Sequence, residues 1–136
     1  MKISTRGRYA IRVMIDLAEL NTGEYTPLID VAKRQNISEK YLEIILKVLV
    51  KEKLLKGLRG KGGGYQLTRP PKDYTVGEIL QLSEGSLVQV ACLKSDAEVC
   101  QRKGDCITLP LWQKFNTLVH DFFFHITLED LLNGNF

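Results

Sequence analysis

Three cysteines are the residues of this chain best suited to chemistry. Cys92, Cys100 and Cys106 are its only cysteines, and seven and five residues separate them. Thiolates are soft ligands that suit iron-sulfur clusters and zinc. Their spacing differs from the C-x2-C pairs of structural zinc sites, which favours a cluster. Because an odd number of cysteines leaves no closed disulfide set, we expect a reducing compartment, the cytoplasm.

Other interpretations of the cysteines stay open at this point. They can be free structural side chains, although they lie in a charged loop rather than in a periodic apolar segment. They can bind zinc in a protein with no DNA preference. They can also belong to a thiol enzyme that uses His120 or His125, but no nucleophile–base pattern or oxyanion glycine accompanies them.

A cluster held by three cysteines has an incomplete ligand set. A 2Fe-2S cluster, which we take as the expected cofactor, needs a fourth ligand. A 4Fe-4S cluster is the alternative, and it can leave one iron open or bound to a small molecule. The candidate donors elsewhere in the chain are Glu43, Asp96, Glu98, Asp105, His120 and His125.

Charge is distributed unevenly along the 136 residues, whose formal net charge is +3. Residues 1 to 72 carry 15 Lys and Arg against 7 Asp and Glu, whereas residues 73 to 136 carry 4 against 9. This division predicts a polyanionic partner for the first half alone. The alternative is a pair of oppositely charged faces that attract each other.

The first predicted helix begins after Ser4 or Thr5, either of which can act as its N-cap. Apolar residues at helical spacing give it one buried stripe. Arg6, Arg8 and Tyr9 lie at its start, where free backbone N–H groups and the positive end of the helix dipole favour an anion.

A helix-turn-helix pattern follows. Thr26 as N-cap and Pro27 at the first helical position predict a short helix that ends near Gln35. After a tight turn, Ser38 caps a second helix, which has an apolar stripe at i, i+3, i+4 and i+7 and a basic outer face. Two short helices joined this closely are typical of DNA-binding modules.

A wing is predicted after these helices. Two short strands flank the glycine-rich run Gly60–Gly64, whose turn allows the backbone to approach a duplex closely. Arg59, Lys61 and Arg69 supply charge for phosphates or for a narrow minor groove. A nucleotide-binding loop is a poor alternative, because the run lacks the G-x-x-x-x-G-K-[ST] order.

A strongly apolar helix is predicted from about Thr108. Apolar residues cover so much of its circumference that it must be buried, and a chain this small offers little core. We expect it to pair with a second copy in a homodimer, the alternative being an internal helix of a monomer. The residues expected at the dimer contact are Leu111, Trp112, Phe115, Leu118, Val119, Phe122 and Phe123.

The patterns together predict a mainly α fold with a small β wing. A winged helix-turn-helix domain spans residues 1–85, a cysteine-bearing loop 86–107, and a long C-terminal dimerisation helix with a short final helix 108–136. Thr75–Glu78 and Thr127–Asp130 are predicted capping boxes that start short helices. No apolar run is long enough to cross a bilayer and no signal peptide opens the chain, so no membrane partner is expected.

Three stretches, residues 1–10, 38–43 and 58–67, resemble a superfamily of bacterial winged-helix regulators that contains IscR, NsrR and CymR. The cysteines, followed by the pair Leu111–Trp112, are similar to those of IscR-type members. The resemblance implies a homodimer whose two recognition helices read a pseudo-palindromic operator in double-stranded DNA. It also implies that an iron-sulfur cluster modulates DNA affinity, and that the regulated genes serve cluster biogenesis.

The chain departs from this family at the fourth cluster ligand. IscR-type proteins have a histidine three residues after the last cysteine, where this chain has Leu109. NsrR-like members use an aspartate near the start of the first helix, where this chain has Arg8. The seven residues between Cys92 and Cys100 also exceed the family's usual number.

The expected DNA contacts come from the start of the first helix, the second helix of the helix-turn-helix, and the wing. A cluster-free repressor of the same fold, which senses thiol oxidation or nitric oxide, is the alternative function. The residues expected to contact DNA are Lys2, Thr5, Arg6, Arg8, Tyr9, Ser38, Glu39, Lys40, Tyr41, Glu43, Lys47, Arg59, Lys61, Gly62 and Gly63.

Overall fold

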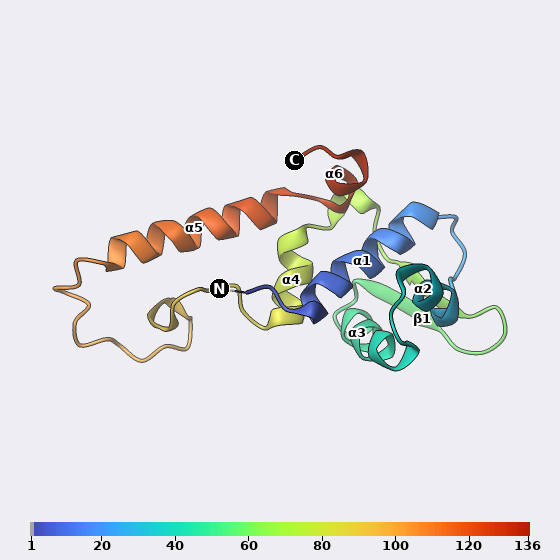
Figure 1. Ribbon diagram of the computed structural model, residues 1–136, viewed down its shortest axis with the longest axis horizontal. Helices are drawn as coiled ribbons and strands as arrows, with labels where there is room; N and C mark the ends of the chain where they lie inside the picture. Colours follow the sequence, from blue (N-terminus) through green and yellow to red (C-terminus); the bar gives the residue numbers. More distant parts are fainter. Residues whose placement is uncertain (1) are drawn as a thin grey trace.

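The computed structural model describes residues 2–136 and shows a mainly helical chain with one two-stranded sheet. In Figure 1 a compact body holds the first four helices and the wing, while α5 and the loop before it project to one side. The fold is therefore a winged helix-turn-helix body with a long C-terminal helix, as predicted. Its elements are α1 (Thr5–Leu20), α2 (Leu28–Gln35), α3 (Glu39–Lys51), β1 (Leu55–Leu58), β2 (Gly64–Leu67), η1 (Pro71–Asp73), α4 (Val76–Glu84), η2 (Ala91–Leu93), α5 (Leu109–His125) and α6 (Leu128–Asn133).

The core lies where the apolar stripes of α1 and α3 meet. The predicted stripe of α1 is buried from Ala10 to Leu17, with Val13 and Met14 fully inaccessible, but Leu20 at its end is 39% exposed. The stripe of α3 is equally buried, and Leu128 of α6 closes the core from the C-terminal side. The periodicity of apolar residues thus predicted the inward faces correctly.

Helix starts follow the predicted caps with one exception. The Ser4 hydroxyl accepts a hydrogen bond from the Gly7 N–H at 3.1 Å, and that of Ser38 accepts one from the Tyr41 N–H at 3.2 Å. The prediction for α2 was wrong by one residue, because Pro27 is the N-cap and lies outside the helix. Thr26 instead pairs with Tyr65 in an isolated antiparallel bridge.

That bridge joins the wing to the loop between α1 and α2. Strands β1 and β2 pair antiparallel, with Leu55 opposite Leu67 and Leu58 opposite Gly64. The Tyr65 N–H donates to the Thr26 carbonyl at 2.8 Å, and the Thr26 N–H donates back at 2.9 Å. Gly64 has φ of +145°, and a Cβ there would collide with the Thr26 backbone, so only glycine fits.

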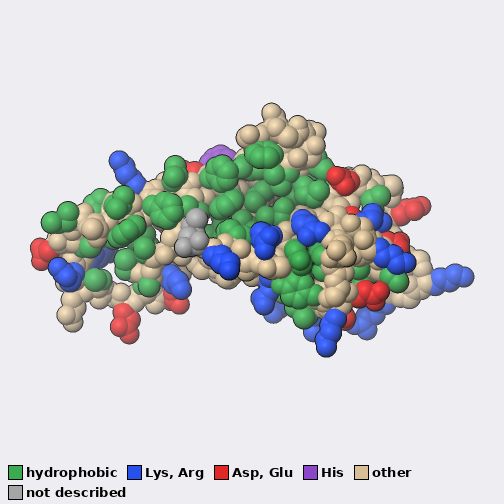
Figure 2. Space-filling model, viewed as in Figure 1, with side chains coloured by type: hydrophobic (Ala, Val, Ile, Leu, Met, Phe, Trp, Pro, Cys, Tyr) green, Lys and Arg blue, Asp and Glu red, His purple; other side chains and the backbone are tan. Residues whose placement is uncertain are grey.

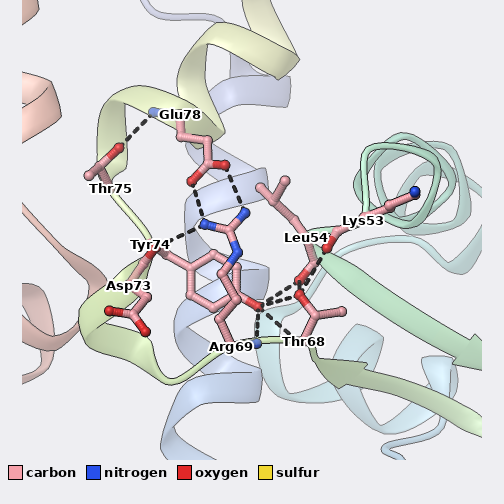
Figure 3. Close-up of polar contacts among 8 residues, drawn as sticks. All are labelled: Lys53, Leu54, Thr68, Arg69, Asp73, Tyr74, Thr75 and Glu78. Carbon is pink, nitrogen blue, oxygen red and sulfur yellow. Dashed lines mark hydrogen bonds and ion pairs between the residues drawn. The ribbon is translucent and has the colours of Figure 1, made fainter.

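Tyr74 anchors the base of the wing (Figure 3). Its ring is fully buried, and its hydroxyl donates to the Leu54 carbonyl at 2.7 Å. The same hydroxyl accepts from the N–H groups of Thr68 at 2.8 Å and Arg69 at 3.0 Å. The residue before β1 and the two residues after β2 are therefore tied to one side chain.

Arg69 has a structural role, while its part in phosphate binding stays a prediction. Its guanidinium lies 4.6 Å from the centre of the Tyr74 ring and makes two hydrogen bonds to the Glu78 carboxylate, at 2.8 and 3.1 Å (Figure 3). The hydrogen bond with Glu78 raises the pKa of Arg69 above its ordinary value. The Arg69 side chain is 34% exposed, and it also donates to the Asp73 carbonyl at 2.9 Å.

The two predicted capping boxes differ in outcome. Thr127 and Asp130 form a complete box, with hydrogen bonds in both directions. The Thr75 hydroxyl accepts from the Glu78 N–H at 3.1 Å, but the Glu78 side chain turns to Arg69. The first box is therefore only half formed, because a stronger charged partner is available.

Helix α5 packs against α4 near its C-terminal end and extends past the body at its N-terminal end (Figure 1). Phe124 lies against Gly77 so closely that a Cβ at residue 77 would collide with its ring. The Val76 N–H donates to the Ile126 carbonyl at 2.8 Å, which secures the junction with α6. Among residues 2–136, no helix combines the length and apolarity of a membrane span.

Candidate nucleic-acid interface and cysteine hollow

The outer face of α3 is exposed and largely charged. Lys40, Glu43, Ile44 and Lys47 recur at helical spacing on this face, and all four are exposed. The opposite face packs in the core, so the side chains on the outer face are available to contact a ligand. In Figure 2 most of the visible Lys and Arg side chains lie over the end of the molecule that holds α2, α3 and the wing.

The start of α1 is held beside α3. The rings of Tyr9 and Tyr41 meet edge to face, with centroids 5.8 Å apart. The Arg12 guanidinium covers the other side of the Tyr9 ring at 4.9 Å and also donates to the Gln35 side-chain carbonyl at 3.2 Å. The structure therefore brings the predicted contacts of α1 and α3 onto one surface.

The basic residues at the start of α1 remain exposed, as a DNA contact requires. Arg6 and Arg8 are exposed, and Arg8 donates a hydrogen bond to the Thr5 hydroxyl at 3.2 Å. Lys2, in the segment before the helix, is also exposed. These side chains carry charge without a carboxylate partner among the ion pairs of the described residues.

The tip of the wing is a glycine turn bearing two cations. Arg59 and Lys61 are exposed, and the backbone reverses at Gly60 and Gly62, with φ of +90° and +76°. A hydrogen bond from the Gly63 N–H to the Gly60 carbonyl at 3.0 Å closes the turn. The predicted wing residues thus lie at the end of the sheet, where a duplex can reach them.

The three cysteines line one hollow at the start of α5. Cys92 and Cys100 are exposed and Cys106 is half-buried, and all three are free thiols. The hollow measures about 270 Å³ and is open to solvent. Its other lining residues are Leu93, Lys94, Ala97, Glu98, Val99, Lys103, Leu109 and Gln113.

This donor set suits a metal cluster in its chemistry, although the loop must tighten to bind one. Within residues 2–136 no three His, Cys, Asp or Glu side chains already converge on a common point. A hydrogen bond with the Thr108 hydroxyl, at 3.5 Å, lowers the pKa of the Cys106 thiol below its ordinary value. A more acidic thiol favours the thiolate, which is the form that binds metal.

The candidate fourth ligands differ in whether they line the hollow. Glu98 is the one candidate named from the sequence that lines the hollow, and Gln113, which sequence reasoning missed, is a second oxygen donor there. Leu109 lines it too, but an aliphatic side chain cannot ligate. The two remote histidines have other contacts: His125 Nδ1 lies 2.7 Å from the Asp121 carbonyl, and His120 stacks on Phe124. Gln113 follows Leu109 by one helical turn, and this spacing could have identified it from the sequence as a possible ligand.

The exposed side of α5 is apolar over several turns. Leu111, Trp112, Leu118 and Phe122 are 57%, 36%, 67% and 58% exposed. Val119, by contrast, is only 8% exposed because it faces the chain's own body. Phe115 and Phe123, also expected at the dimer contact, are half-buried.

Comparisons with known proteins agree with these features. The family model Rrf2, an iron-dependent transcriptional regulator, matches residues 3–134. The HTH-type transcriptional regulator IscR of Vibrio campbellii is 35% identical over 141 residues, which cover 99% of this chain and 79% of the relative. Both the winged-helix body and the C-terminal helix are therefore within the region compared.

Solved structures give the same result. IscR of T. potens has a TM-score of 0.76 at 33% identity, covering 98% of this chain and 88% of that one. CymR of B. subtilis, a global cysteine regulator, has a TM-score of 0.77 at 36% identity, covering 96% and 95%. The chain belongs to the Rrf2 family and is a transcriptional regulator rather than an enzyme.

Proposed function

We propose that this regulator binds double-stranded operator DNA as a homodimer and that an iron-sulfur cluster on its cysteine loop modulates the binding. The observation that carries the proposal is the exposed outer face of α3, with the start of α1 beside it and two exposed cations at the tip of the wing. Helix α3 would enter the major groove, and Arg59 and Lys61 of the wing would reach the adjacent backbone or minor groove. A regulator of this kind acts in the cytoplasm, where bacterial DNA is.

The homodimer is supported by the exposed side of α5. Four large apolar side chains in one helix exceed what a lone surface helix commonly shows. A second copy related by a two-fold axis covers such a surface with the same surface. Two α3 helices related by that axis would match the two halves of a pseudo-palindromic operator.

The cluster is supported by the three free thiols around one hollow. Cys92, Cys100 and Cys106 would hold it, with an oxygen of Glu98 or Gln113 as the fourth ligand of a 2Fe-2S form. Oxygen or nitric oxide can destroy such a cluster, and a supply of iron allows it to be rebuilt. The regulated genes would serve iron-sulfur cluster biogenesis.

Anaerobic reconstitution tests the cluster. The wild-type protein, incubated with iron and sulfide, should gain visible absorption and retain iron and sulfide after desalting. Cys92→Ser, Cys100→Ser and Cys106→Ser should each retain far less. Equal retention by wild type and all three variants would reject the cysteines as ligands.

DNA binding is measured separately, by fluorescence anisotropy with a duplex selected from a random pool by the wild-type protein. Holo protein, apo protein and Cys92→Ser are compared on that duplex. A difference between holo and apo that Cys92→Ser lacks would support modulation by the cluster. Equal affinities of holo and apo protein would reject it while leaving DNA binding intact.

A cluster-free repressor that responds to thiol oxidation is the second candidate. Its support is the likeness to CymR, together with three solvent-accessible thiols that do not yet converge. Under this alternative, the protein would take up no iron and sulfide. Its affinity for the selected duplex would instead change after treatment with peroxide and recover with dithiothreitol.

A further inference from the structure

Ile44 is an exposed apolar residue on the largely charged outer face of α3. It is 50% exposed in the middle of α3. Lys40 lies one turn before it and Lys47 about one turn after it, both exposed on the same face. Tyr41 and Val48, which flank it at i−3 and i+4, are half-buried, so Ile44 is the one large apolar side chain of α3 that is exposed. A single exposed side chain is a small apolar surface for an ordinary protein contact.

The core does not need this side chain. Ile45 and Leu46, the next two residues, point inward and are 2% and 0% exposed. The exposed apolar side of α5 lies elsewhere, because α5 and α3 are at different ends of the molecule in Figure 1. Ile44 is therefore free to contact a ligand that binds the outer face of α3.

We propose that Ile44 contacts the C5-methyl group of a thymine and so specifies a thymine at one position in each operator half-site. The inference rests on the proposed docking of α3 in the major groove. The thymine methyl is the one apolar group on the base edges there, and side chains without polar atoms recognise it by contact. Lys40 and Lys47 hold the helix against the backbone on either side.

The size of the effect follows from the area buried. One methyl group removed from water is worth about 0.8 kcal/mol, which corresponds to roughly fourfold in affinity. Two symmetric half-sites would double the free energy, giving roughly 10- to 20-fold for the whole operator.

Methyl deletion in the DNA tests this contact. A duplex is first selected from a random pool by the wild-type protein, and each thymidine pair related by the dyad is then replaced by deoxyuridine. One pair should weaken wild-type binding by roughly 10- to 20-fold. Ile44→Ala should bind the thymidine duplex about as weakly as wild type binds the deoxyuridine duplex. It should lose no further affinity with deoxyuridine, because each change removes the same contact.

The control is Ile29→Ala, because Ile29 is an isoleucine of similar exposure, 45%, on α2. It should keep the full response to deoxyuridine. Urea unfolding of Ile44→Ala checks that the variant is folded, as expected for an exposed position. Ile44→Val retains branched methyl groups and should keep most of the response.

Three results would overturn the inference. Wild type and Ile44→Ala could respond equally to every deoxyuridine pair, or wild type could respond to none. Either leaves the proposed function standing, because the selected duplex is still bound. If no duplex is enriched at all, the proposed function fails together with the inference.

Discussion

The carboxylate of Glu84 accepts two hydrogen bonds from Ser4, one from its backbone N–H at 2.9 Å and one from its hydroxyl at 2.7 Å. Ser4 is also the N-cap of α1, so the last turn of α4 is bound to the first turn of α1. The cysteine loop begins directly after α4, and α1 carries Arg6 and Arg8. This contact therefore links the base of the loop to a proposed DNA-contacting segment.

Glu84→Ala should lower the free energy of unfolding by about 1 kcal/mol, because Ser4 loses its partner. It should also weaken DNA binding, since the start of α1 is less firmly placed. Gly7 lies so close that a Cβ would collide with the Glu84 carboxylate and approach Leu80 Cδ2 at 3.2 Å.

Gly7→Ala should therefore displace Glu84 and lower the free energy of unfolding by much of the same amount as Glu84→Ala. Urea unfolding of both single variants and the double variant checks this, with Gln81→Ala, an exposed residue of α4, as the control. Strict additivity of the two losses would show that the residues act independently.

Tyr74→Phe should lower the free energy of unfolding by about 1 to 3 kcal/mol. The buried hydroxyl serves the Leu54 carbonyl and two backbone N–H groups, which would lose a partner inside the protein. In urea the midpoint should fall while the slope stays constant. Tyr25→Phe, at a half-buried position in the α1–α2 loop, is the matched control and should change little.

Arg59→Ala and Arg69→Ala should have different consequences. Arg59 is exposed at the wing, so its loss should weaken DNA binding and reduce the salt slope by about 1 if it meets a phosphate. Loss of Arg69 removes its contacts with Glu78 and Tyr74 and should instead cost about 1 kcal/mol of stability. Anisotropy titrations at several salt concentrations, together with urea unfolding, separate the two. Equal DNA affinity of Arg59→Ala and wild type at every salt concentration would remove Arg59 from the interface.

Asp130→Asn should destabilise the protein at neutral pH and lose this effect in acid. Hydrogen bonds from the Thr127 backbone N–H and hydroxyl lower the pKa of Asp130 below its ordinary value of 3.8. A depressed pKa means that the carboxylate contributes stability above the unfolded value, and that this contribution disappears as the pH falls through the folded value. Urea unfolding of both proteins across this range should show the two curves converging. A constant difference would mean that charge on Asp130 is irrelevant.

Periodic apolar residues were sufficient to predict α1, α3 and α5, because a helix that buries one face repeats that face along the sequence. The same pattern cannot reveal partners far along the chain. Thr26 was predicted to be a helix cap but pairs with Tyr65, and the ion pair of Arg69 with Glu78 was not predicted. In each case the local sequence contained no sign of the contact, because the partner is a residue farther along the chain.

The ion pair between the buried Asp16 of α1 and the exposed Arg34 of α2 is a further example. Asp16 is 2% exposed and accepts three hydrogen bonds from the Arg34 side chain, at 2.8, 3.0 and 3.3 Å, together with one from the Gln35 amide at 2.9 Å. No local pattern marks Asp16 as buried, since charged residues commonly lie on the outer face of a helix. Its partner appears only when α2 folds against α1.

The candidate site was partly predictable for the same reason. The three cysteines share one short loop, so proximity in sequence already implied proximity in space. Gln113 reaches their hollow only because α5 begins beside the loop, which no spacing within the loop reveals. The expected DNA contacts came from helix faces and a glycine turn, whose exposure follows directly from the apolar pattern.

The backbone bridge between Thr26 and Tyr65 should make the base of the wing open far less often than its tip. Its two amide hydrogens are tied to the α1–α2 loop, so they should exchange with solvent only when the body itself opens. The amides of Lys61 and Gly62, beyond the last strand pair, should exchange orders of magnitude faster. The base of the wing would thus belong to the same cooperative unit as the helices, while its tip adapts to the duplex.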